Sequence, residues 1–150
     1  MPSAHIHCAD QRADRMLELS PSITWSDNIW LGVTVEEARY ANRIEKLKQT
    51  IAPNKFIGAE PLLGDLGELD LQGIEWVVVG GESGANSRPC NEEWVIYLRY
   101  QCETQLAHFT FKQWGGRFRK RNGSLQQGRY HHNMPVSNQV KSTIVTDDSL

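Results

Sequence analysis

The sequence predicts an α/β fold: a parallel sheet with helices, arranged as a partial (β/α) barrel or an open sheet and followed by a basic C-terminal extension. Two patterns predict this class. Five short runs are apolar or rich in β-branched residues, and several segments between them repeat apolar residues every three or four positions. Strands and helices that alternate at this spacing favour a parallel sheet.

The chain length limits how much of a barrel can form. A closed eight-stranded barrel usually takes about 250 residues, whereas this chain has 150. We expect residues 1–136 to fold as one α/β domain and residues 137–150 to be a flexible polar tail. An incomplete barrel leaves strand edges exposed, so we expect the tail, a second copy in a homodimer, or a partner to cover them.

Each expected strand is short. The strands are predicted at residues 5–9, 29–35, 55–59, 75–80 and 109–112. The second run is almost entirely apolar, as in a strand that is covered on both faces. The fourth run is rich in valine and ends at a glycine pair, which makes it the clearest strand pattern in the chain.

Three helices are expected, at residues 10–19, 36–51 and 92–106. The second has acidic residues in its first turn and lysines near its end, as the helix dipole favours. Asn91 is expected to cap the third helix. Core positions are expected for four tryptophans that lie in or beside apolar runs: Trp25, Trp30, Trp76 and Trp94.

Composition excludes two classes of protein. No stretch approaches about 18 consecutive apolar residues, so no membrane-spanning helix is predicted. The first residues lead into no apolar run of the secretory kind. Cys8, Cys90 and Cys102 are odd in number and far apart, which is typical of reduced thiols inside a cell. We therefore expect a cytoplasmic protein with no membrane partner.

Charge is distributed unevenly along the chain. Residues 1–103 carry 9 basic and 16 acidic side chains, a balance of −7. Residues 104–146 carry 7 basic side chains and no carboxylate, a balance of +7. A chain divided in this way is suited to contact a polyanion, or an acidic protein surface, at one end.

The most basic part of that end also contains aromatic residues. Basic side chains neutralise phosphates and aromatic faces stack on bases, so this composition is typical of a surface that binds single-stranded nucleic acid. A solvated basic turn is the alternative interpretation. The candidate contacts lie in residues 112–132 and are Lys112, Trp114, Arg117, Phe118, Arg119, Lys120, Arg121 and Arg129.

A second group of candidates follows the ends of the expected strands. In parallel α/β sheets, functional side chains gather beyond the carboxyl ends of the strands. A glycine-rich turn there would offer backbone N–H groups to a nucleoside-like or phosphate-bearing ligand. The alternative is that the glycines only make a tight turn, and we expect no catalytic residue in this chain alone. The pocket candidates are Glu36, Glu60, Gly80, Gly81, Glu82, Ser83, Arg88 and Lys112.

Two short groups of metal-ligating residue types occur near the ends of the chain. His5, His7 and Cys8 form one, and residues 131–132 the other, but neither has a second ligand pair at the usual spacing. The sequence also contains neither a nucleophile elbow nor a phosphate-binding P-loop. We expect no metal ion and no cofactor.

One ordered series of segments spans most of residues 10–135. It consists of Asn28–Glu36, Glu60–Gly64, Trp76–Gly84, Arg88-Pro89, Gln101-Cys102, Phe111–Gly115, Gly128-Arg129 and Met134-Pro135. Together these segments resemble the phage gene product 37/gene product 68 family, whose members are similar to radical-SAM enzymes. The resemblance implies that the pocket candidates line the mouth of a barrel.

The resemblance also implies a difference. Family members carry clustered cysteines for an iron–sulfur cluster in their N-terminal portion, and this sequence has no close cysteine run. The chain is therefore similar to the C-terminal half of such a protein, a truncated radical-SAM-like domain. Residues 80–82 resemble the Gly-Gly-Glu that contacts SAM, but they come late in the chain, so we do not expect bound SAM.

Two functions are consistent with these features. The first is a non-catalytic phage or prophage accessory protein that binds a host protein or a nucleic-acid-handling complex, as an anti-defence inhibitor would. The alternative is the C-terminal half of a split radical-SAM-like enzyme acting on nucleic acid or nucleotide. In that case a separate N-terminal partner chain would supply the cysteines.

Overall fold

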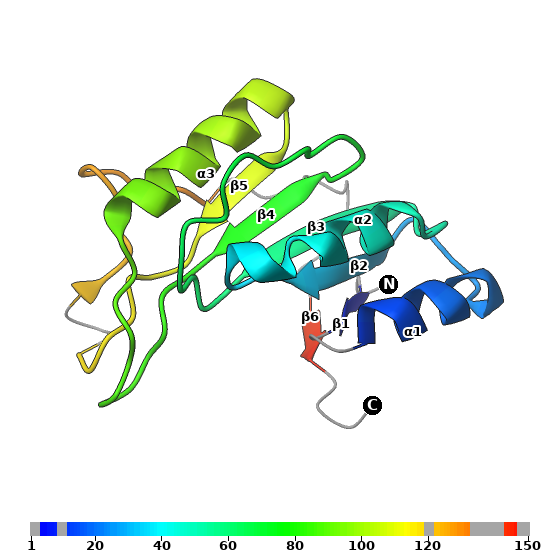
Figure 1. The fold of residues 1–150 in the computed structure, drawn as a ribbon, viewed down its shortest axis with the longest axis horizontal. Coiled ribbons are helices and arrows are strands. Elements are labelled where there is room, and N and C mark those ends of the chain that lie inside the picture. The colour runs from blue at the N-terminus through cyan, green and yellow to red at the C-terminus, as the bar shows by residue number, and fades with distance from the viewer. Residues whose placement is uncertain (1–3, 9–11, 119–121, 133–142, 147–150) are drawn as a thin grey trace.

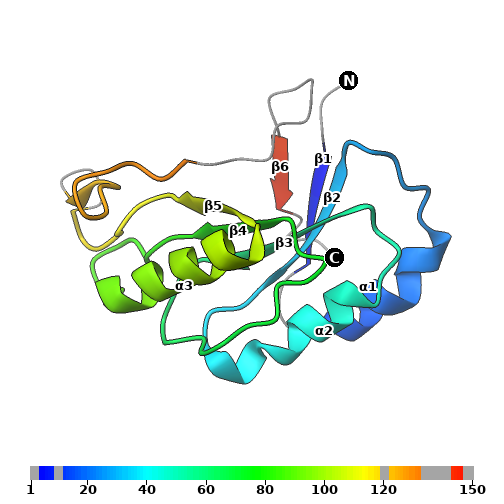
Figure 2. The same ribbon diagram turned by 90° about the horizontal axis from the view of Figure 1, so that it is seen from above.

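A computed structural model describes residues 4–8, 12–118, 122–132 and 143–146. Within these residues the strands form one sheet of six, in which every adjacent pair is parallel (Figures 1 and 2). The predicted α/β class is confirmed. The strands are β1 (Ala4–Cys8), β2 (Ile29–Thr34), β3 (Asn54–Ala59), β4 (Trp76–Val79), β5 (His108–Phe111) and β6 (Thr143–Thr146).

The strand order explains why the sheet is similar to part of a barrel. The order is β5-β4-β3-β2-β1-β6, so β1 to β5 follow one another as they do in the chain. A (β/α) barrel has the same sequential order of parallel strands. The carboxyl ends of β2 to β5 therefore meet at one edge, where the pocket candidates follow them.

The helices lie together on one face of the sheet (Figure 2). In chain order they are α1 (Ala13–Leu19), η2 (Ser20–Ser22), η3 (Ala38–Tyr40), α2 (Asn42–Lys48) and α3 (Glu92–Gln105). Asn91 caps α3 as predicted, because its side-chain oxygen accepts a hydrogen bond from the Glu93 backbone N–H at 2.8 Å. Among the described residues, no helix has both the length and the apolar composition needed to span a bilayer.

Alternation along the strands produces two buried clusters. The helix-facing cluster contains Leu31, Val33, Ile57, Val77 and Phe111, together with apolar residues of the helices. The other face carries a smaller cluster of Trp30, Phe56, Trp76 and Val78. The prediction that Trp30 and Trp76 are core residues is confirmed, since they are 5% and 3% exposed, and Trp25 and Trp94 pack against the larger cluster.

The helix predicted at residues 36–51 is shorter and less regular than expected. It begins as a 3₁₀ turn, η3, and continues as α2 only as far as Lys48. Glu37 is extended, and the Glu36 carbonyl accepts a hydrogen bond from the Leu63 N–H at 2.9 Å. This bond holds the start of the segment against the loop after β3, so the chain cannot coil there.

Of residues 137–150, which we expect to be a flexible polar tail, the structure describes only Thr143–Thr146. These four residues form β6, which pairs in parallel with β1. β6 lies at the opposite edge of the sheet from β5. All four residues of this strand are β-branched, a composition that favours a strand, so the sequence analysis missed a local pattern that was present.

Candidate functional site

The structure brings Glu60 and Lys112 together at the carboxyl edge of the sheet, which we call the mouth. Glu60 follows β3, Lys112 follows β5, and their Oε2 and Nζ atoms are 3.1 Å apart. Strand β4 runs between them and ends at Val79, immediately before Gly80. A Cβ atom on residue 80 would lie 3.2 Å from the Glu60 side chain. The glycine therefore leaves space for the ion pair to form across the end of β4.

Glu36 is held away from that pair by a partner on α2. The Arg43 guanidinium lies 3.2 Å from the Glu36 carboxylate and donates to the Thr34 carbonyl at 2.8 Å. It also stacks on the Tyr40 ring at 3.9 Å. The Arg43 side chain is only 7% exposed, so this pair fastens α2 to the end of β2. Sequence reasoning missed Arg43 because an arginine on an amphipathic helix is expected to face solvent.

Glu82 and Arg88 form a third ion pair, which closes the loop after β4. The Arg88 Nε donates to Glu82 Oε2 at 2.8 Å, and the Arg88 backbone N–H donates to the same oxygen at 3.2 Å. These bonds, with the side-chain bond the larger cause, lower the pKa of Glu82 below its ordinary value. Both side chains remain in contact with solvent, so the carboxylate is held by geometry rather than by burial.

The glycine-rich turn at residues 80–84 is used mainly to join two loops. The N–H groups of Gly80, Gly81 and Gly84 donate to the carbonyls of residues 59, 113 and 116, respectively. A Cβ on Gly81 would lie 1.9 Å from the Trp114 carbonyl oxygen. The turn and residues 113–116 thus extend the β4–β5 pairing, with Ser83 opposite Gly116. Three of the N–H groups that we expected to be available to a phosphate therefore donate to backbone carbonyls instead.

The basic segment, residues 112–132, divides into a packed part and an exposed part. Lys112 pairs with Glu60 at the mouth. The Trp114 ring packs against Phe111 at 4.6 Å, and its indole N–H donates to the Leu125 carbonyl at 2.7 Å. Both residues were candidates for nucleic-acid contact, and the structure gives each a partner within the chain.

The exposed part carries two basic and aromatic groups. The Arg117 guanidinium lies 5.7 Å from the centre of the Phe118 ring, which is 58% exposed. Tyr130 is 66% exposed and stacks on His132 beside Arg129. Neither arginine forms a salt bridge with any residue that the structure describes. The candidates Arg119, Lys120 and Arg121 lie outside the described residues.

Arg99 of α3 docks the end of the basic segment onto the helix. Its Nη1 donates to Gln126 Oε1 at 3.0 Å and to His131 Nε2 at 2.9 Å, and its Nη2 donates to Gln127 Oε1 at 2.9 Å. Because a guanidinium only donates hydrogen bonds, His131 Nε2 must be unprotonated. Burial, and then the charge of Arg99, lower the pKa of His131 below its ordinary value.

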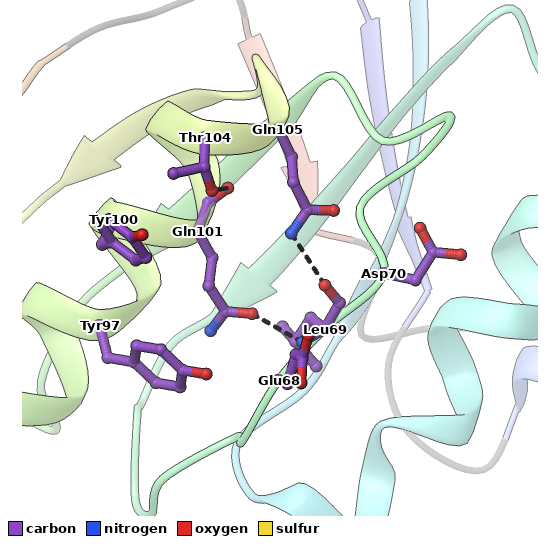
Figure 3. A pocket seen from close by; sticks show the side chains of 8 residues that line it. All are labelled: Glu68, Leu69, Asp70, Tyr97, Tyr100, Gln101, Thr104 and Gln105. Carbon is purple, nitrogen blue, oxygen red and sulfur yellow. Dashed lines mark hydrogen bonds between the residues drawn. The ribbon is translucent and has the colours of Figure 1, made fainter.

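A groove on the other side of α3 was also missed by the sequence analysis (Figure 3). It has a volume of about 710 Å³ and runs between α3 and the loop at residues 68–70, beside the exposed Tyr97 and Tyr100. Gln101 accepts from the Leu69 N–H at 2.7 Å, and Gln105 donates to the Leu69 carbonyl at 2.9 Å. These glutamines hold the loop to the helix, so their amides are structural.

The thiols of Cys90 and Cys102 resist the deprotonation that a nucleophile or a metal ligand requires. Burial raises the pKa of Cys90 to about 11 and that of Cys102 to about 12. No three described His, Cys, Asp or Glu residues are grouped so that they could hold a metal ion. The part of the chain that the structure describes therefore offers no group of ligands for an iron–sulfur cluster.

Comparisons with known proteins give one family. Neither curated proteins nor solved structures gave a match. A family model described as "Protein of unknown function (DUF5131)" matches residues 4–135. This match includes β1 to β5, the mouth and the exposed part of the basic segment. The chain belongs to the DUF5131 family.

Proposed function

We propose that this chain is a non-catalytic binding module whose basic segment contacts single-stranded nucleic acid. One observation carries the proposal: two exposed groups combine an arginine with aromatic rings, namely Arg117 over the Phe118 ring, and the stacked Tyr130 and His132 rings that follow Arg129 in the chain. Free guanidinium groups can neutralise phosphates, and exposed rings can stack on bases. The resemblance to phage proteins supports an accessory role at a host nucleic-acid-handling complex, for example as an anti-defence inhibitor.

The charged residues of the mouth are less available to a phosphate than those of the basic segment. Each of its charged candidates already has an opposite charge within hydrogen-bond distance: Glu36 with Arg43, Glu60 with Lys112, and Glu82 with Arg88. A ligand would have to replace these pairs. The exposed arginines of the basic segment need no such exchange, so phosphate binding there costs less free energy.

The experiment compares two double variants in a binding assay with a labelled single-stranded oligonucleotide. Arg117→Ala with Phe118→Ser removes one exposed cationic and aromatic group. Stacking of one base is worth about 1–3 kcal/mol, so affinity should fall by about tenfold or more. The control, Arg15→Ala with Leu19→Ser, removes one exposed arginine and one exposed apolar side chain from α1.

The two outcomes separate specific contact from general attraction. A loss confined to the Arg117 and Phe118 variant, with affinity that falls steeply between about 50 and 200 mM salt, supports the proposal. An equal loss in both variants would indicate attraction by net charge alone. No binding by the unaltered chain would overturn the proposal.

A second candidate function is a split enzyme completed by another chain. The observation that favours it is the sequential parallel order of β1 to β5, with Glu60 and Lys112 paired at the carboxyl edge. We propose to look for a neighbouring reading frame that encodes closely spaced cysteines and to purify the two chains together. A stable complex with an iron–sulfur absorption band would support this candidate, and failure of the chains to associate would contradict it.

A further inference from the structure

The groove between α3 and the loop at residues 68–70 lies outside both the mouth and the basic segment. Its volume of about 710 Å³ falls within the range of about 300–1,000 Å³ that is typical of ligand pockets. Tyr97 and Tyr100 line its helix side, and Glu68 and Asp70 line its loop side (Figure 3). Tyr97 is 37% exposed and Tyr100 is 59% exposed, so both rings are available to a partner.

The backbone on the loop side of the groove is fixed by hydrogen bonds to α3. Gln101 accepts from the Leu69 N–H at 2.7 Å and donates to the Gly67 carbonyl at 3.0 Å. Gln105 accepts from the Leu71 N–H at 2.8 Å and donates to the Leu69 carbonyl at 2.9 Å. The groove is therefore formed before a partner arrives, which lowers the conformational entropy lost on binding.

The two elements that form the groove are acidic. Residues 64–73 carry three carboxylates and no basic side chain, and α3 carries three carboxylates and one basic side chain, Arg99. Arg99 is bound to the basic segment, and Lys48 pairs with Asp70 at 3.0 Å. Glu68 is exposed and forms no salt bridge with any residue that the structure describes. These charges favour a cationic occupant and repel a nucleic acid.

The exposed tyrosines favour arginine over lysine as that cation. A guanidinium is planar, so it can stack on an aromatic ring and also pair with a carboxylate through two hydrogen bonds, whereas an ammonium is a point charge. The chain itself contains this arrangement. The Arg43 guanidinium lies 3.9 Å from the centre of the Tyr40 ring and 3.2 Å from the Glu36 carboxylate.

The spacing of the two rings matches an extended peptide. Tyr97 and Tyr100 are three residues apart on α3, and such side chains have Cβ atoms about 5–6 Å apart. In an extended chain, alternate residues point to the same side and lie about 6.6 Å apart. Two arginines at alternate positions of an extended segment can therefore each contact one ring.

We infer that this groove binds an extended, arginine-containing segment of a partner polypeptide. One guanidinium lies on the Tyr97 ring and the next on the Tyr100 ring, and Glu68 supplies the carboxylate that pairs with them. The inference goes beyond the proposed nucleic-acid contact and does not depend on it.

The groove and the nucleic-acid surface lie on different sides of α3. Gln126 and Arg129 form a hairpin in the basic segment through backbone hydrogen bonds of 2.9 and 3.0 Å. Arg99 holds this hairpin on the side of α3 away from the groove. Because the two ligands have opposite charges and separate surfaces, one chain can bind both at once and link a nucleic acid to a basic polypeptide.

The test is a titration of a labelled peptide in which arginine and glycine alternate, followed by fluorescence anisotropy with the full chain at constant ionic strength. The groove variant, Tyr100→Ala with Glu68→Gln, removes one exposed ring and the unpaired carboxylate, so peptide affinity should fall by about tenfold or more. The control variant, Tyr130→Ala with Glu18→Gln, removes an exposed tyrosine ring and an exposed carboxylate outside the groove. It should bind the peptide as the unaltered chain does.

A second peptide tests the role of charge without altering the protein. Citrulline has the shape of arginine but no charge, so the peptide with citrulline at each arginine position should bind about tenfold or more weakly. This comparison tests the inference even if the groove variant does not fold. No binding of the arginine peptide, equal binding of the two peptides, or equal losses in the groove and control variants would overturn the inference.

Two further measurements separate this inference from the alternatives. Light scattering of the chain alone, at several concentrations, tests for a second copy in the groove. Self-association that the groove variant abolishes would show that the occupant is a second copy, and would overturn the choice of a partner polypeptide. If the peptide binds as expected but a single-stranded oligonucleotide does not, the groove stands and the nucleic-acid function fails. If the oligonucleotide binds and the peptide does not, the function stands and the groove fails.

Discussion

The mouth and the basic segment carry similar side chains and differ in how these are partnered. At the mouth, acidic and basic residues from different strands and loops satisfy one another, as Glu60 and Lys112 do at 3.1 Å. In the basic segment, Arg117 and Arg129 lie in solvent beside exposed rings. The comparison shows that charge at the carboxyl edge of a parallel sheet is not by itself a binding site. What matters is whether the charge remains available after folding.

Glycine use differs in the same way between the two regions. At the mouth, Gly80 and Gly81 are required by close approach, since a Cβ at either position meets Glu60 or the Trp114 carbonyl. In the basic segment, Gly128 has positive φ and no neighbouring atom near its missing Cβ. One region uses glycine to pack loops tightly, and the other uses it to turn an exposed hairpin.

The largest effect on stability is expected at Gly81. Gly81→Ala places a Cβ 1.9 Å from the Trp114 carbonyl oxygen, so the two loops must separate. We expect the free energy of unfolding to fall by about 3 kcal/mol or more, measured by chemical denaturation. The control is Gly64→Ala, whose Cβ would meet nothing closer than 3.8 Å. Equal stability of the two variants would show that the mouth loops are not packed as described.

A smaller loss is expected when the Arg43 pair is broken. Arg43→Met keeps the aliphatic length of the side chain but leaves the Glu36 carboxylate and the Thr34 carbonyl without this donor. The free energy of unfolding should fall by about 2 kcal/mol. Oligonucleotide affinity should not change when it is measured under conditions in which both proteins are folded. A loss of oligonucleotide affinity without a loss of stability would indicate that the mouth is part of the binding surface.

Substitution of Lys112 tests whether a lysine that is paired at the mouth contributes to oligonucleotide binding. Lys112→Met removes a half-exposed ion pair, so its cost in stability should be about 1 kcal/mol or less. We expect oligonucleotide affinity to stay within about twofold, because the lysine is already occupied by Glu60. Affinity that drops as far as in the Arg117 and Phe118 variant would contradict the division between the two regions.

The smallest effect is a pH dependence at His131. Burial and Arg99 keep the pKa of folded His131 below its ordinary value of 6.5. As the pH falls through 6.5, His131 binds a proton in the unfolded chain but not yet in the folded chain. The free energy of unfolding therefore decreases as the pH falls from 6.5 toward the lower pKa of the folded state. His131→Gln should flatten this part of the curve of unfolding free energy against pH. An unchanged curve would mean that His131 does not contact Arg99.

The elements were largely predictable from sequence, and the contacts between them were not. Residues 29–35 and 75–80 carry dense β-branched patterns, and the structure places β2 and β4 there. The acidic and basic ends of residues 36–51 predicted a long helix, but the hydrogen bond from Leu63 to the Glu36 carbonyl shortened it. β6 is a run of four β-branched residues that the sequence analysis did not use, and its pairing with β1 sets its place in the sheet.

Some residues of the candidate site were predictable from the sequence, and others were found only in the structure. The sequence identified Glu60, Gly80 and Lys112 as neighbours at the carboxyl edge, because parallel strands bring their ends together. It did not identify Arg99 or Gln126, since neither residue belongs to a motif. Their importance comes from a hydrogen bond between α3 and a hairpin 27 residues further along the chain.

The sequence alone determined the order of strands and helices, the parallel sheet, and a C-terminal end rich in arginine and lysine. These properties follow from local periodicity and composition, which act before distant parts of the chain meet. Only the tertiary structure decided which charges are neutralised at the mouth, which rings of the basic segment stay exposed, and which side chains of α3 line the groove. The physical reason is that ion pairs and hydrogen bonds need a few ångströms of proximity, and the packing of the sheet and its loops sets that distance.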